Sequence, residues 1–173
     1  AKFGPWEGDF TSAILPEPYS TRSQPVYALW DRADLTGAEM PSVHLTGAPS
    51  LGAKCDGANM AQAVLPAAFL IGASLKGTVL VDAEMQGVVA WGADLEGANL
   101  GSAQLHEAAL TNANLRTARL VAAYLLLAAS NEAEFTVAVL CWADLRHAAL
   151  TAENPTGSIL TAVTFPGHTP PRA

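Results

Sequence analysis

The sequence has few of the residues on which most binding and catalytic sites depend. Of its 173 residues, 14% are charged, 7% are aromatic and two are cysteines. Acidic residues outnumber basic ones by 16 to 9, which gives a formal net charge of −7. Because nucleic-acid binding relies on lysine and arginine meeting phosphate, this balance argues against direct binding to DNA or RNA.

Long hydrophobic segments and catalytic motifs are also missing. The longest apolar run spans 120–129, well short of the roughly 20 residues that a helix needs to cross a bilayer, so we expect no transmembrane segment. There is no phosphate-binding loop and no HExxH, CxxC or GxSxG motif. The four histidines are best read as solvated surface residues. The sequence therefore predicts no enzyme, no cofactor and no metal site.

What the sequence does contain is a repeat of five residues. From Trp30 to Phe165 the residues at multiples of five form 28 centre positions, of which 17 are Leu and six are Met, Phe or Trp. Two residues before each centre, 22 of 28 positions are Ala. Two residues after a centre lie 11 of the 14 glycines. Each five thus combines a large apolar residue, a small one and a position typical of tight turns.

Neither a straight helix nor a straight strand keeps such leucines together. Five residues advance a helix by about 140°, and a strand alternates its faces with a period of two. The leucines stay together if the chain turns a corner every five residues, so that each centre and the small residue before it point inward. We therefore expect a solenoid whose interior is filled by leucine side chains, including Leu35, Leu75, Leu95, Leu100, Leu105, Leu110, Leu115 and Leu120.

Two patterns predict four corners per coil, so that one coil consists of four fives. The charged residues Asp56, Lys76, Glu96 and Arg116 alternate in sign at spacings of 20, so stacked coils would place opposite charges side by side. Among the centres, large and small residues alternate at the same spacing from Trp30 and Ser50 onward. In such coils Cys55 and Cys141 lie about four coils apart, roughly 19 Å at the spacing of strands, so we expect two free thiols.

Several fives match a known pattern more closely, among them Ala33-Asp34-Leu35, Ala58-Asn59-Met60, Ala93-Asp94-Leu95 and Ala98-Asn99-Leu100. They resemble the A(D/N)Lxx motif of the pentapeptide-repeat family. This resemblance implies an all-β fold, a right-handed quadrilateral parallel β-helix (a solenoid), here with about seven to eight coils of four fives each. The expected organisation is an irregular segment rich in proline and aromatic residues at 1–27, the β-helix at 28–167 with a bulge at 153–155, and a proline-rich tail at 168–173. For the first segment we favour a capping coil, and the alternative is a partner-binding arm with aromatic anchors.

The most informative surface is apolar. On the wall centred on residues 30, 50 and 70, the outward positions of three adjacent coils hold Pro49, Leu51, Phe69, Ile71, Val89 and Trp91. Six such residues on one flat wall exceed the scattered hydrophobic residues of an ordinary surface and indicate a docking face for a protein. A second apolar group on the opposite wall contains Val121, Val139 and Trp142, together with Cys141 and, round the corner, Tyr124 and Leu126.

These features favour a non-enzymatic interaction rod, a scaffold or an accessory subunit of a larger assembly that docks proteins on its apolar walls, with no homodimer indicated. One alternative, by resemblance, is a DNA-mimicking inhibitor of DNA gyrase; the acidity fits, but basic residues interrupt the acidic rows. Another is a pentapeptide protein of the thylakoid lumen or periplasm. The chain begins at Ala1 rather than Met; if that reflects processing, a plastid-lumen, periplasmic or secreted location follows.

Overall fold

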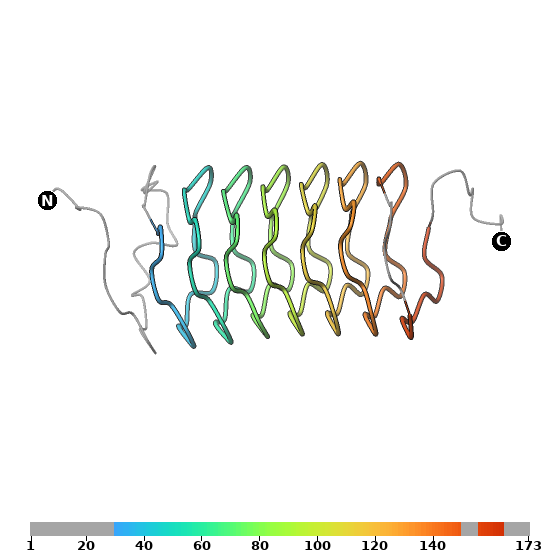
Figure 1. Ribbon diagram of the computed structural model, residues 1–173, viewed down its shortest axis with the longest axis horizontal. Coiled ribbons are helices and arrows are strands. Elements are labelled where there is room, and N and C mark those ends of the chain that lie inside the picture. The colour runs from blue at the N-terminus through green and yellow to red at the C-terminus, as the bar shows by residue number, and fades with distance from the viewer. Residues whose placement is uncertain (1–29, 150–155, 165–173) are drawn as a thin grey trace, which may run out of the picture.

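The computed structural model describes residues 30–149 and 156–164. Figure 1 shows these residues as a rod of similar coils stacked along one axis in chain order, from blue to red. The expectations for the capping coil at 1–27, the bulge at 153–155 and the tail at 168–173 concern residues outside the described ranges.

The β-structure is built from isolated parallel bridges, and the described residues contain neither a helix nor a longer strand. Each bridge joins residues 20 apart, beginning with Asp34 to Lys54, Glu39 to Asn59, His44 to Val64 and Pro49 to Phe69. These four ladders confirm that each coil has four sides, one for each five. The fold is a right-handed quadrilateral β-helix. We number its walls by their centres: wall 1 has centres 30, 50, 70 and onward, wall 2 has 35, 55, 75, wall 3 has 40, 60, 80, and wall 4 has 45, 65, 85.

Main-chain hydrogen bonds hold each coil to the next, which explains why such short extended pieces suffice. The amide of Leu35 donates to the carbonyl of Lys54 at 2.7 Å, and the amide of Lys54 donates back to the carbonyl of Ala33 at 2.9 Å. The corner contributes a third bond, from the amide of Gly37 to the carbonyl of Asp56, at 2.8 Å. The described residues contain no helix that could span a membrane.

Each corner is a tight turn between one centre and the next small residue. The amide of Ala38 donates to the carbonyl of Leu35 at 3.0 Å, and Gly37 between them has a φ of 68°. Because positive φ is confined to the third residue of these turns, they are type II turns. Among residues 30–149 and 156–164, positive φ occurs at ten glycines and also at 16 other residues, for which this region is strained. The corner geometry is therefore imposed by the stacking of the coils and not by glycine alone.

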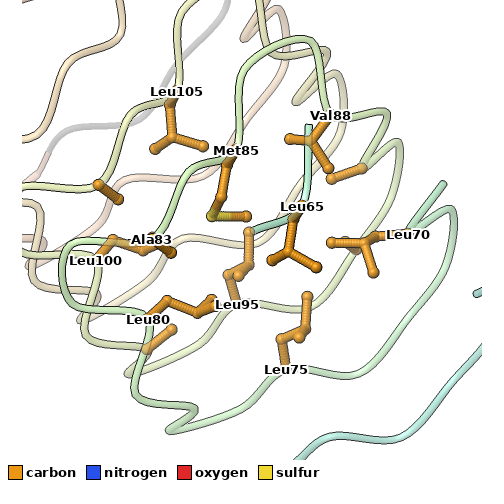
Figure 2. Close-up of a cluster of buried hydrophobic side chains, with 14 of the residues drawn as sticks. Leu65, Leu70, Leu75, Leu80, Ala83, Met85, Val88, Leu95, Leu100 and Leu105 are labelled. Carbon is orange, nitrogen blue, oxygen red and sulfur yellow. The ribbon is translucent and has the colours of Figure 1, made fainter. Parts of the chain in front are cut away.

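The bore of the rod is filled by the two inward rows. Figure 2 shows centre residues such as Leu65, Leu75 and Leu95 meeting the smaller Ala83 and Val88 inside the coils. The eight leucines named from the sequence are all 2% exposed or less: Leu35, Leu75, Leu95, Leu100, Leu105, Leu110, Leu115 and Leu120. Leu160 departs from the pattern. It occupies a centre but is 40% exposed, because it lies in the last described coil, where no further described coil covers it.

Three hydroxyl-bearing residues are buried in the bore. The Thr78 hydroxyl donates to the carbonyl of Cys55 at 2.7 Å, and the Ser130 hydroxyl donates to the carbonyl of Ala149 at 3.4 Å. The Ser50 hydroxyl has no hydrogen-bond partner among the described residues. Since an unsatisfied buried hydroxyl costs about 1–3 kcal/mol, Ser50 is a local weak point of the core.

Candidate interaction surface

Side chains leave the rod from three positions in every five: the residue before the centre and the two corner residues after it. Because the chain returns to the same wall after every fourth five, each position forms a straight column along the rod. A surface feature is thus defined by which residue types follow one another in these columns.

Wall 1 brings together the six apolar residues predicted as a docking face. Pro49, Phe69 and Val89 are successive partners in one bridge ladder. Beside them, the amides of Gly52 and Gly72 donate to the carbonyls of Ile71 and Trp91, which stacks Leu51, Ile71 and Trp91 in the neighbouring column. Leu51, Phe69 and Trp91 are 43%, 44% and 52% exposed, and the other three residues are partly buried. All six face outward on three adjacent coils.

The apolar surface of wall 1 is longer than those six residues. The bridge ladder continues from Val89 to Ala109, Ala129 and Ala149, so the column before the centres carries no polar side chain from coil to coil. The sequence contains the signal, an alanine before each of these centres. These outward alanines do not stand out in the sequence, because alanine is small and is the usual residue at the inward positions of the repeat.

A second apolar patch lies on wall 3 toward the other end of the rod. Val139 bridges to Ile159, and the amide of Ala122 donates to the carbonyl of Cys141, which places Val121 and Cys141 in one column. Trp142, at the adjoining corner, is 65% exposed. The structure adds two members that sequence reasoning did not single out, Val137 and Ile159, each 52% exposed.

Tyr124 lies round the corner from that patch, in the column that bridges Gln104 and Asp144. Its ring stacks on His106 with centroids 5.7 Å apart and an interplanar angle of 13°, so it belongs to wall 4. His106 is thereby accounted for as a stacking partner. Within residues 30–149 and 156–164, no group of three or more His, Cys, Asp or Glu side chains is arranged to hold a metal ion.

Charged residues concentrate on wall 2, but their pairing differs from the straight ladder predicted from the sequence. Lys76 Nζ lies 2.9 Å from Asp94 Oδ2 and 3.7 Å from Glu96 Oε2. The hydrogen bond from Lys76 to Asp94 is the main reason why the pKa of Lys76 is raised above its ordinary value. Asp56, predicted as its other neighbour, accepts from the Ser74 hydroxyl at 2.6 Å and from the Lys76 amide at 3.0 Å.

The same diagonal geometry recurs one step along the rod, where Arg116 lies 3.6 Å from Glu134. A long side chain at the corner reaches the residue before the next centre, 18 positions on, more closely than the corner residue directly above it. Because the paired groups are largely exposed, solvent screens each pair and its contribution to stability is small. Wall 2 is thus a solvated surface in which opposite charges largely neutralise one another.

The comparisons with known proteins agree with this geometry. Residues 52–80 and 83–121 match the family model of pentapeptide repeats in eight copies. HetL, a pentapeptide repeat protein involved in heterocyst differentiation regulation from the cyanobacterium Nostoc sp. strain PCC 7120, is 29% identical with a TM-score of 0.81; the match covers 93% of this chain and 73% of HetL. A search of curated proteins gave no match.

Two further structures share less. QnrB1, a plasmid-mediated fluoroquinolone resistance protein, is 18% identical with a TM-score of 0.41, over 79% of each chain. Rfr23, a pentapeptide repeat protein from the cyanobacterium Cyanothece 51142, is 17% identical with a TM-score of 0.41, over 80% of this chain and 90% of Rfr23. The repeat of five, its four-sided coil and the matches to the family model and to HetL together show a chain that contains pentapeptide repeats and is similar to the proteins of the pentapeptide-repeat family.

Proposed function

We propose that this chain is a non-enzymatic interaction rod that docks protein partners on its apolar walls, as a scaffold or an accessory subunit. The observation that carries the proposal is the stack of Pro49, Phe69 and Val89 beside Leu51, Ile71 and Trp91 on wall 1. A contiguous apolar surface with exposed aromatic residues is typical of protein-binding sites.

Backbone strain supports the proposal from a second direction. Leu127, Val137 and Trp142 have φ between 59° and 60° and are each more than half exposed. A bulky residue in this conformation destabilises the fold by about 1–2 kcal/mol. Because the side chain stays exposed, it gains almost no free energy from burial that could offset this strain. At equivalent corners the chain repeatedly has glycine. Large apolar side chains that weaken the fold and face solvent are best explained by a binding role.

The charge distribution argues against the alternative of a DNA mimic. A mimic needs unbroken rows of negative charge, whereas Lys76 and Arg116 each pair with carboxylates along wall 2. HetL, with which the whole rod is similar, is described as a regulatory protein, which accords with a role in binding. We accordingly expect no inhibition in a gyrase supercoiling assay; inhibition at low concentration would favour the mimic instead.

The direct experiment is capture of native partners on immobilised protein, with wild type compared with the double variant Phe69→Ser and Trp91→Ser. Both side chains lie on wall 1 and outside the bore, so the variant should keep the wild-type circular dichroism and unfolding midpoint yet lose its partners. Tyr124→Ser removes an exposed aromatic residue from wall 4 and serves as the control, with capture retained. Trp142→Ser tests wall 3 separately. Equal capture by all variants would refute docking on these walls.

A further inference from the structure

The two halves of wall 1 have opposite relief. In the three coils centred on Ser50, Leu70 and Ala90 the middle of the wall is high, because its two outward columns hold Pro49, Phe69, Val89 and Leu51, Ile71, Trp91. The corners beside them are low, and they are occupied by Gly47, Ala67, Gly87 on one edge and Gly52, Gly72, Gly92 on the other. In this half, which we call the ridge, apolar side chains project between two rows of small corner residues.

The next three coils reverse the arrangement. The middle of the wall is lower, since its column before the centres is Ala109, Ala129 and Ala149, while the column after the centres holds Thr111 and Asn131. The corner residues here have longer, exposed side chains. They are Glu107, Leu127 and His147 on one edge and Asn112 and Glu132 on the other. We call this half the trough: an alanine floor between two rows of longer side chains. The change from ridge to trough falls between the bridge partners Val89 and Ala109.

We propose that the partner on wall 1 is a second copy of this chain, docked face to face and antiparallel, with the ridge of each copy in the trough of the other. The two-fold axis runs along the strand direction between the Val89 and Ala109 coils. It brings Phe69 onto Ala129 of the second copy, Pro49 onto Ala149 and Val89 onto Ala109. At one edge Ala67 meets Leu127 of the second copy, and Gly87 meets Glu107.

The pairing matches large residues with small ones in the column before the centres and in the two glycine-bearing corner columns, and it sets Trp91 against the smaller Thr111. Ile71 faces Asn131, whose side chain is of similar size. At the other edge Gly72 receives Glu132 of the second copy, and Gly92 receives Asn112. No carboxylate is brought against another carboxylate. This reciprocal fit arises because the central and corner columns change size in opposite directions at the same coil, which a partner of unrelated shape would not require.

In a parallel face-to-face arrangement, large residues of one copy would face large residues of the other. It would set the ridge of one copy on the ridge of the other, with Phe69 against Ile71 and Val89 against Trp91. The tall corners would then also collide, Leu127 against Glu132, while the two alanine floors would be held apart. The relief of the wall thus selects the antiparallel pair from the two symmetric choices.

The interface is small. Six coils at about 4.8 Å per coil span roughly 29 Å, so the contact lies at the low end of the range for specific interfaces. We therefore expect a dimer that dissociates on dilution. The period of five gave no indication of a homodimer, because the signal lies in side-chain size down each column from coil to coil. The inference rests on the proposed docking role of wall 1 and specifies its occupant.

A charge-swap experiment tests both the dimer and its register. Wild-type protein in sedimentation equilibrium should shift from monomer to dimer as its concentration is raised. Phe69→Lys and Ala129→Asp should each weaken dimerisation on the order of tenfold or more, because each places a charge in the apolar contact. Lysine and aspartate already occupy the equivalent positions at Lys54 and Asp94, so both variants should fold. An equimolar mixture of the two should dimerise again.

Cross-linking tests the alignment independently, in a background with Cys141→Ser. Chains with Ala67→Cys mixed with chains carrying Leu127→Cys should be joined by a short bismaleimide, whereas neither variant alone should be. Gln62→Cys mixed with Ala122→Cys is the matched control, since these corners are likewise three coils apart and have positive φ but border wall 3. That mixture should stay uncrosslinked.

The outcomes separate this inference from the proposed function. A wild-type monomer at all concentrations would overturn the second-copy inference, and so would a charge-swap mixture that stays monomeric while wild type dimerises. If the pure protein is monomeric but Phe69→Ser with Trp91→Ser still abolishes capture of another protein, wall 1 docks a different partner and only this inference fails. If neither dimer nor capture depends on wall 1, both fail.

Discussion

The Thr78 hydroxyl donates a hydrogen bond of 2.7 Å to the carbonyl oxygen of Cys55, one coil earlier and inside the bore. Ser158 makes the corresponding bond to the carbonyl of Phe135, also 23 residues earlier. An inward hydroxyl beside the centre row thus has a fixed acceptor in the preceding coil. This geometry lets the narrow bore accept a polar atom without leaving it unpaired.

Replacing Thr78 with valine should destabilise the rod by about 0.5–1.5 kcal/mol, because the shape is retained and one buried hydrogen bond is lost. Val43 and Val88 show that valine fits this inward position. The converse change, Val88→Thr, should be nearly neutral, since its hydroxyl would meet the carbonyl of Leu65 in the same relation. Urea unfolding of both variants measures the difference; equal losses would mean that the bond contributes nothing.

The two cysteines should differ sharply in reactivity. Burial, with a smaller contribution from the nearby carboxylates Asp56 and Asp34, raises the pKa of the Cys55 thiol from 9.0 to about 12. Cys141 is partly exposed, and both cysteines are free thiols. A thiol reagent at mildly alkaline pH should therefore modify one group in the native protein, and the second only after unfolding. Fast modification of Cys55 in the native state would contradict this burial.

The same shift predicts a dependence of stability on pH. The unfolded chain loses the Cys55 proton near 9 and the folded chain holds it until about 12, so the folded state binds more protons in between. The contribution is complete below pH 9 and is lost as the pH rises toward 12. Unfolding midpoints of wild type should fall faster with alkaline pH than those of Cys55→Ala, a change that Ala90 shows to be compatible with a centre position. Parallel curves would argue against a raised pKa.

Core and corner leucines offer a matched comparison of burial. Leu100 is 1% exposed and Leu127 is 52% exposed. Leu100→Ala should cost about 2–5 kcal/mol through lost transfer energy and a cavity in the closely packed bore. Leu127→Ala should stay within about 0.5 kcal/mol, as surface changes usually do. Chemical denaturation of the two variants provides the measurement, and similar losses would mean that the repeat does not place these leucines as described.

Much of the fold can be predicted from the sequence because every group of five residues repeats the same pattern. Leucine at the centre, alanine two residues earlier and glycine at the corner together require an inward row and a turn, and the spacing of 20 between Asp56 and Lys76 supplies the number of walls. No long-range guess is needed, since each coil contacts only its neighbours. The core leucines follow from the same register.

Details that depend on side-chain reach could not be obtained in this way. Lys76 pairs most closely with Asp94 and not with the residue directly above it, because its flexible side chain leans from the corner across the wall toward the residue before the next centre. The exposed corner residues Val137 and Leu127 were missed for another reason. Glycine is the typical corner residue of the repeat. A large residue at a corner therefore looks like a departure from the repeat, and its exposure on the surface is not recognised from the sequence.

The ion pair between Asp144 and Arg146 should stabilise the rod only above strongly acidic pH. Arg146 Nη2 lies 2.7 Å from Asp144 Oδ2, and this hydrogen bond is the main cause that holds the pKa of Asp144 below its usual value of 3.8. A lowered folded-state pKa gives stability that is present above pH 3.8 and is lost as the pH falls through the folded value. The arginine is half exposed, so solvent screens the pair and we expect its contribution to stability to be small.

A double-mutant cycle with Asp144→Asn and Arg146→Gln isolates that pair. The coupling between the two changes should be measurable at neutral pH and should shrink as the solution is acidified below pH 3.8. Addition of salt should reduce it as well, because the pair is largely solvated. A coupling that does not change with pH would show that the two residues act through packing and not through charge.

The last prediction concerns the corners, where conformational strain can be tested in both directions. Gly57 has a φ of 65°, and a Cβ added there would meet nothing within 4 Å, so Gly57→Ala introduces strain without a clash. The strain of about 1–2 kcal/mol is partly offset because the unfolded chain loses the freedom of glycine, so we expect a net loss of at most about 1 kcal/mol. The loss should be smaller for Gly57→Asn, since asparagine tolerates this conformation better.

Val137 has a φ of 59° in the equivalent position and is 52% exposed. Val137→Gly should relieve that strain, while the greater freedom of glycine in the unfolded chain offsets about 0.5–1 kcal/mol of the gain. We therefore expect a net stabilisation of at most about 1 kcal/mol, together with weaker binding of any partner on wall 3. A variant that is more stable yet binds less well would show that this corner sacrifices stability for recognition. A variant that loses stability would show instead that Val137 is needed for packing between coils.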